Sequence, residues 1–214
     1  AEYSFGNGSS GGDRIEASAF HGSEPVPTRV DLPLGSPDSF SVRLVHSFRP
    51  DFFSMASAAY VKDPEHDDPT IPSVTRYSLS FYGKERISSG TIDHALIFGM
   101  IRKYDRVPTL FSIGEEFLYR DGAVAEAEDG NRTGRNSVFG RFEFVQRTPA
   151  ELGIPSAEPD GSRPVVAATL GYARNLANSG SVSTDLGGSV THDFLPSEFD
   201  PAYSGDPWIG KVFL

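Results

Sequence analysis

The 214-residue sequence contains no cysteine, which excludes a disulfide framework, a thiolate metal site and a cysteine nucleophile. Only two methionines and one tryptophan are present. No apolar run approaches the roughly 20 residues that a transmembrane helix needs, so only strands could carry this chain across a membrane. A basic face is also lacking, because the formal net charge is −10, and this argues against a nucleic-acid partner.

Glycine and aromatic residues are abundant instead, with 22 Gly, 16 Phe and 8 Tyr. They fall in short segments that alternate with a period of two, which is typical of strands rather than helices. The alternation is clearest between residues 163 and 213. There, apolar positions such as Leu170 and Val190 follow small polar ones such as Thr169 and Ser189.

The same rhythm predicts about ten or eleven strands along the chain. We expect them near residues 2–5, 14–20, 40–49, 53–60, 74–82, 92–104, 109–120, 138–146, 166–173, 182–191 and 208–214. Long loops rich in Pro and Gly separate some of them, at 21–38 and 148–163, since proline cannot sit in a central strand. The acidic residues concentrate in such loops, where solvated surface is the simplest interpretation.

The predicted strands carry small polar residues on the face opposite to the apolar one. A soluble sandwich would place Lys and Glu there, whereas a membrane barrel keeps a small polar interior and turns its apolar face to lipid. We therefore predict one all-β domain over residues 1–214: an antiparallel transmembrane β-barrel of about 10–12 strands, or the C-terminal part of a larger barrel lacking N-terminal strands.

Six charged side chains fall on the predicted inward face and are the candidates for lining a lumen. They are Arg43, Arg76, Arg141, Glu143, Asp185 and Asp193. Two interpretations stay open: an ion-pair network that fills a narrow barrel, or a charged constriction that selects solutes. Glu115 and Glu116 are adjacent, so one of them must face outward or lie near a rim.

No catalytic site, metal site or cofactor is predicted. The five histidines share no spacing that would place two metal ligands on one element. His66 lies among acidic residues of the 62–72 loop, but that loop lacks the spacing of an EF-hand. No Gly-x-Ser-x-Gly motif marks a nucleophilic serine, and the sequence indicates a protein that is not an enzyme.

Several segments resemble, in the same order, a family of uncharacterised outer-membrane proteins of Gram-negative bacteria. They are residues 15–25, 38–44, 136–143, 170–172, 196–203 and the closing 211–214. The resemblance covers nearly the whole chain and corresponds to the C-terminal half of the family, whose members carry a His-rich N-terminal half. It implies a bacterial outer-membrane location and contact with outer-membrane lipid, and it brings no activity or catalytic residues.

Three functions follow from this reading. The first is a passive pore for small solutes, lined by the Arg, Glu and Asp set. The second is a structural barrel that docks a partner, such as other subunits of a membrane-associated complex, through its acidic loops; the long Pro-rich loops at 21–38 and 148–163 favour it. The third is a soluble β-sandwich or lipocalin-like carrier, in which the same alternation separates core from solvent. An open lumen separates the first two, and a need for detergent separates both from the third.

Overall fold

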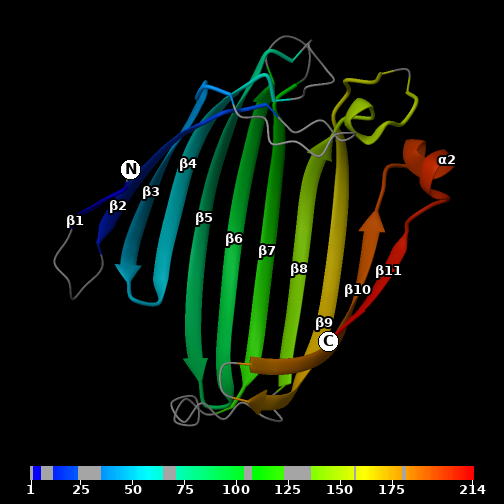
Figure 1. Cartoon of the computed structure of the whole chain (residues 1–214). Coiled ribbons are helices and arrows are strands. Elements are labelled where there is room, and N and C mark those ends of the chain that lie inside the picture. Colours follow the sequence, from blue (N-terminus) through cyan, green and yellow to red (C-terminus); the bar gives the residue numbers. More distant parts are fainter. Residues whose placement is uncertain are drawn as a thin grey trace. The chain divides into compact units, whose positions relative to one another are not determined.

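The computed structural model describes residues 2–5, 12–23, 35–64, 71–103, 108–122, 136–156, 158–179 and 182–214. Within these residues the protein is all-β. Eleven strands pair in one antiparallel sheet and follow one another in chain order from β1 to β11 (Figure 1). The prediction of an all-β antiparallel fold is therefore confirmed, and the strand number lies in the expected range.

The strands are β1 (Glu2–Phe5), β2 (Asp13–Phe20), β3 (Ser39–Arg49), β4 (Phe52–Lys62), β5 (Ser73–Ile87), β6 (Gly90–Lys103), β7 (Leu110–Asp121), β8 (Asn136–Arg147), β9 (Arg163–Ser179), β10 (Val182–Phe194) and β11 (Trp208–Phe213). Short helices also lie in the connections that the structure describes: η1 (Ala150–Leu152), η2 (Ser197–Phe199) and α2 (Asp200–Tyr203).

The described strands form an open sheet and do not close into a barrel. Strands β1 and β11 are its two edges, and no pairing joins them among the described residues. Alternation within a strand specifies which face each side chain occupies, but it does not specify the partner of an edge strand. The sequence pattern therefore predicts which face of the sheet each side chain occupies, but not whether the sheet closes into a barrel.

By its internal contacts the chain divides into two compact units. Unit 1 comprises Ala1–Phe81, Ile97–Ser112 and Gln146–Arg163. Unit 2 comprises Tyr82–Leu96, Ile113–Val145 and Pro164–Leu214.

In unit 1 the register of β2, β3 and β4 assigns every side chain to one of two faces. Arg43 lies opposite Glu16 on β2 and Ser57 on β4, so these three define the polar face of unit 1. The alternate residues of β3 occupy the other side, where Phe40 pairs with Tyr60. We call this side the apolar face of unit 1.

A small buried core lies at one end of the polar face of unit 1. Val61, Ile71 and Val74 pack together, with relative exposures of 8%, 8% and 1%, and Phe20 packs against them. The core is confined to the strand ends near the connections, so it does not cover the apolar face.

In unit 2, two aromatic rings each lie over a glycine of a neighbouring strand. A Cβ built on Gly171 would lie 2.1 Å from the Phe139 ring, and one on Gly187 would lie 2.5 Å from the Phe213 ring. Both glycines lie on the same side as Thr169 and Thr191, whose hydroxyls are 2.7 Å apart. We call this side the polar face of unit 2, and the absence of a side chain on each glycine makes room for the ring.

The sheet leaves many of its large apolar side chains uncovered. Among the described residues 25 large hydrophobic side chains are exposed, whereas eight hydrophobic residues are buried. The exposed ones include Leu170 at 57% and Val212 at 85%, both on the side of unit 2 opposite the polar face. A sheet of this size in water would bury such a face, because each large apolar side chain gains about 1.5–3 kcal/mol on burial.

Candidate functional site

On the polar face of unit 1 the predicted Arg43 forms part of a cross-strand ion pair. Its guanidinium donates to Glu16 at 3.2 Å, and Arg14 lies 2.8 Å from the other oxygen of the same carboxylate. Glu16 therefore lies between two arginines. The predicted Arg76 lies two residues before Ser78, whose hydroxyl is 2.7 Å from that of Ser57, so Arg76 shares this face.

Small hydroxyl side chains form another part of the polar face of unit 1. Besides the Ser57–Ser78 contact, the hydroxyls of Ser18 and Ser41 lie 2.8 Å apart. These hydroxyls hydrogen-bond to one another across neighbouring strands, beside the long charged side chains of the same face.

The predicted Arg141 is the centre of the charge cluster in unit 2. It reaches Glu116 on β7 at 3.2 Å and its strand neighbour Glu143 at 2.6 Å. Arg141 and Glu143 share a face because they are two residues apart in β8. One guanidinium thus faces two carboxylates, and all three side chains keep between 29% and 53% exposure.

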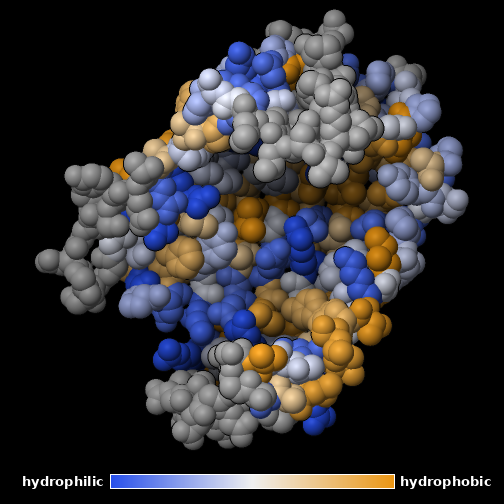
Figure 2. Space-filling model, in the orientation of Figure 1, coloured by the Kyte–Doolittle hydropathy of each residue, from blue (hydrophilic) through white to orange (hydrophobic). Residues whose placement is uncertain are grey.

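This cluster lines a cavity of about 710 Å³ that is formed entirely by residues of unit 2. Asp93, Asp193 and Lys211 add further charges to its wall. Figure 2 shows hydrophilic groups beside hydrophobic ones on the face of the molecule that it draws. A cavity of this size, lined by charges that stay hydrated, suits a water-filled space for small polar molecules.

The predicted Asp185 lies in a second cavity of unit 2, of about 550 Å³. A β-bulge places it there: Thr184 pairs with Ala177 but Asp185 pairs with Asn175, so β9 carries one extra residue. The amide of Asn175 donates to Asp185 at 2.8 Å and to Ser183 at 2.7 Å. Asn175 is 6% exposed, and its contacts hold the bulge in place.

The structure thus places Arg43 and Arg76 on the polar face of unit 1, and Arg141, Glu143, Asp185 and Asp193 on cavity walls of unit 2. That these positions line a lumen stays a prediction. Sequence reasoning missed their partners Glu16, Glu116 and Asn175. The first two have the right parity for the same face, but parity alone does not give the register that brings an acid beside each arginine.

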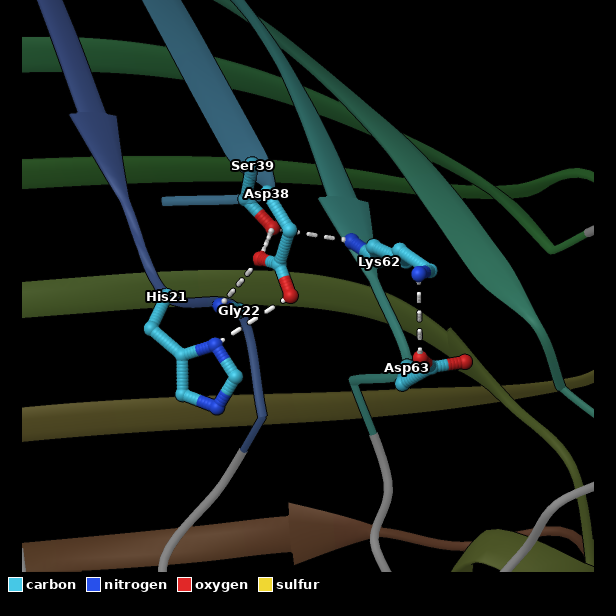
Figure 3. Close-up of polar contacts among 6 residues, drawn as sticks. All are labelled: His21, Gly22, Asp38, Ser39, Lys62 and Asp63. Carbon is cyan, nitrogen blue, oxygen red and sulfur yellow. Dashed lines mark hydrogen bonds and ion pairs between the residues drawn. The ribbon is translucent and has the colours of Figure 1, made fainter. Parts of the chain in front are cut away.

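A polar cluster in unit 1 joins the start of β3 to the ends of β2 and β4 (Figure 3). Asp38 accepts hydrogen bonds from the Gly22 N–H and the Ser39 hydroxyl, both at 2.9 Å, and lies 3.1 Å from His21. These hydrogen bonds, led by the Gly22 N–H and then Ser39, lower the pKa of Asp38. Ser39 also accepts from the Lys62 N–H at 3.0 Å.

This arrangement is a structural tie and not a nucleophilic site. The serine hydroxyl donates to the aspartate, whereas a catalytic serine must face the histidine that removes its proton. Ser39 is 2% exposed, so a substrate could not reach it.

A second tie closes the connection between β8 and β9. Glu151 accepts from the Thr148 N–H at 3.1 Å while Thr148 accepts from the Glu151 N–H at 3.3 Å, which is the reciprocal pattern of a capping box. Lys103 lies 2.8 Å from Glu151 and is 7% exposed. Burial raises the pKa of Glu151, but the hydrogen bonds from Lys103 and Thr148 outweigh it and hold that pKa below its ordinary value.

No group of three or more histidine and acidic residues close enough to hold a metal ion occurs in the part of the chain that the structure describes. The histidine singled out from the sequence, His66, lies outside that part. Within the same residues, no helix combines the length and the apolar character that crossing a membrane requires.

Comparisons with known proteins found no significant similarity. No protein-family model matches the chain, and neither a curated protein nor a solved structure is significantly similar to it. The resemblance to an outer-membrane family accordingly stays a prediction from the sequence.

Proposed function

We propose that this chain is a membrane-spanning part of a β-barrel in a bacterial outer membrane, and that its polar face lines a passage for small solutes. The apolar side of each strand faces lipid, and the polar side faces water. In this proposal the open sheet forms one section of the wall of a barrel.

The observation that carries this proposal is the apolar face of unit 1 along β3 and β4. Aromatic side chains stand at both ends of it: Phe40 stacks on Tyr60 at 5.5 Å, and Phe48 stacks on Phe52 at 5.1 Å. Between them lie Val42 at 48% and Leu44 at 45% exposure, and His46, which pairs with Asp13 at 2.6 Å beside the Phe48 ring. Two aromatic belts around an aliphatic band are the arrangement that a membrane barrel presents to lipid.

The dimensions agree with a bilayer. Eight residues separate Phe40 from Phe48, which is about 26 Å along the strand at about 3.3 Å per residue. A tilt of about 40° reduces this to about 20 Å of height, close to the roughly 25 Å apolar band of outer-membrane barrels. Strands β3 to β10 have 11 to 17 residues, enough for the roughly 9–11 that a crossing needs.

The polar face supports a passage rather than a solid interior. Hydroxyls form part of the polar face of unit 1, and the charge cluster around Arg141 keeps its exposure beside a cavity of about 710 Å³. Charges in a dry, closed interior would cost several kcal/mol each, so their exposure favours a hydrated face.

The first experiment uses Trp208, the single tryptophan, which is 68% exposed and stacks on His192 at 4.1 Å between ring centroids. The purified protein is mixed with lipid vesicles whose acyl chains carry bromine either near the headgroup or near the chain end. We expect quenching of tryptophan fluorescence, stronger from the shallow bromines, because Trp208 lies at the start of β11 where an interfacial belt belongs.

A companion measurement compares electrophoretic mobility with and without boiling. A heat-dependent shift in the presence of lipid or detergent supports a folded membrane protein. Absence of any quenching, together with a protein that stays soluble without detergent and shows no shift, would refute lipid contact and leave the soluble carrier.

The second experiment tests the passage through the substitution Arg141→Gln in planar lipid bilayers. The substitution removes the cation that faces Glu116 and Glu143, so cation selectivity should rise. A unit charge at 4 Å in water is worth about 1 kcal/mol, which corresponds to about a fivefold change in permeability ratio.

Arg174→Gln is the matched control. Arg174 lies on β9 opposite Leu186, on the apolar side, and lines neither cavity. Equal ion selectivity of the wild type, Arg141→Gln and Arg174→Gln would show that the charge cluster does not line the conduction pathway.

A further inference from the structure

The smaller cavity of unit 2 differs from the larger one in the sign of its charges. Lys84, Arg86 and Arg120 line it, and the acidic residues of its wall are Asp121 and Asp185. Lys84 and Arg86 are two residues apart in β5, so both side chains project from the same face about 7 Å apart.

The two acidic groups of this cavity already have partners. Asp185 accepts from the Asn175 amide at 2.8 Å. Asp121 accepts from the backbone N–H of Asn136 at 2.6 Å and from its side-chain amide at 2.5 Å. Both carboxylates are therefore held by neutral amides, and neither forms an ion pair with a cation of the cavity.

The positive charges of this cavity are less fully paired than its negative ones. Arg120 pairs with Asp93 at 2.5 Å. Lys84 and Arg86 are exposed and form no ion pair with any residue that the structure describes. Two unpaired cations on one face, beside an arginine that is paired on one side, make the wall of this cavity positive.

The larger cavity has the opposite balance. Its wall carries four carboxylates and two cations, namely Asp93, Glu116, Glu143, Asp193, Arg141 and Lys211. Leu118 and Phe139 belong to the walls of both cavities, so the two adjoin within unit 2. The charges of this face are therefore segregated and not evenly mixed.

From this arrangement we propose that the smaller cavity is a binding site for small organic anions, whose carboxylate or phosphate group lies between Lys84 and Arg86. The assignment rests on the proposed function, since it names the class of solute that the passage admits. A guanidinium and an ammonium on one face supply charge-assisted hydrogen bonds, and the hydroxyls of Ser137 and Ser183 on the cavity wall supply neutral ones.

The cavity volume sets the size of the solute. About 550 Å³ accommodates a di- or tricarboxylate or a phosphorylated small molecule, and it is at the lower part of the range for small-molecule sites. Because both cations stay exposed, binding should be weak and reversible, as a site along a conduction path requires.

The test is calorimetric titration of the full chain in detergent with succinate and, separately, with inorganic phosphate, at low and constant ionic strength. Choline chloride at the same ionic strength serves as the cation probe. We expect saturable binding of both anions and none of choline. The double substitution Lys84→Gln with Arg86→Gln should weaken anion binding at least about tenfold.

Arg174→Gln is the control for loss of a cation elsewhere and should bind as the wild type does. The two single substitutions, each expected to weaken binding about threefold, replace the double one if it does not fold. Unchanged affinity in the substituted proteins, or no anion binding by the wild type, would overturn the proposal.

Conductance measured on the same preparations separates this inference from the proposed function. Anion binding without conductance would support the anion-binding site and refute the proposed passage for solutes. Conductance without saturable anion binding keeps the passage and refutes the site.

Discussion

The ion pair between Lys103 and Glu151 gives the sharpest test of the structure. Lys103 ends β6, Glu151 lies in η1, and their side chains are 7% and 18% exposed. Replacing Lys103 by Met leaves a largely buried carboxylate with the Thr148 N–H as its remaining hydrogen-bond donor among those described above. Loss of one partner from a buried pair costs about 3–5 kcal/mol, and we expect the lower end because Glu151 keeps some exposure.

Lys62→Met is the matched control. Lys62 also ends a strand and also faces an acidic neighbour, but its ammonium is 3.9 Å from Asp63 and both side chains are more than half exposed. Exposed pairs of this kind contribute about 0–1 kcal/mol. Comparing the two substitutions therefore separates the effect of burial from the effect of losing a positive charge.

The assay is guanidinium unfolding in detergent followed by circular dichroism in the strand region, with hydrogen exchange of residues 148–156 as the local readout. Lys103→Met should lower the unfolding midpoint and raise exchange in that segment, while Lys62→Met changes neither. Equal midpoints and exchange for Lys103→Met and the wild type would refute the buried pair.

The pH dependence of the same pair has a definite sign. The pKa of Glu151 is held below its ordinary value of 4.5, chiefly because the Lys103 and Thr148 hydrogen bonds outweigh burial. A carboxylate with a lowered folded-state pKa stabilises the fold fully above its unfolded-state pKa. The contribution is lost as the pH falls through the lower, folded-state value, and Lys103→Met should abolish this part of the acid sensitivity.

Three further substitutions test the packing and the ties. Gly171→Ala should destabilise the fold by about 1–3 kcal/mol, because its Cβ would lie 2.1 Å from the Phe139 ring, whereas Gly210→Ala, with nothing within 4 Å, should not; unfolding midpoints compare the two. Ser39→Ala should cost about 1–2 kcal/mol, because it removes the acceptor of the Lys62 N–H, and an unchanged midpoint would contradict the tie. Asn175→Leu should raise hydrogen exchange around the bulge at 184–185, since Asp185 and Ser183 lose their shared donor, and unchanged exchange would argue against that role.

Alternation was sufficient to place most strands. Between residues 40 and 60, for example, every second residue except His46 is apolar or small, and the two predicted strands there agree with β3 and β4. It was not sufficient for the end of β5, which runs to Ile87 through Lys84, Glu85 and Arg86. Charges on consecutive residues hide the period of two, although the backbone continues in the sheet.

Two other features depend on contacts that a pattern does not contain. The bulge in β9 shifts the register by one residue, and only the pairing of Asp185 with Asn175 reveals it. The short helices η2 and α2 lie between the strands predicted at 182–191 and 208–214, in a segment for which no element was predicted and where Phe199 is fully buried. One buried ring fixes such a turn through tertiary packing rather than through propensity.

The adjacent glutamates of β7 show how the structure decides what the sequence left open. Glu116 faces Arg141 on the polar side, so Glu115 must project from the apolar side. An acidic side chain on a lipid-facing surface costs less than the roughly 2–4 kcal/mol of a cation at the midplane. The nearby Phe117 and Phe142 lie on the same side, exposed by 40% and 49%, and the exposed part of each gains about 1 kcal/mol in an apolar environment. The gain of the two rings together is comparable with the cost of one carboxylate, so Glu115 weakens the proposed lipid contact of this face without excluding it.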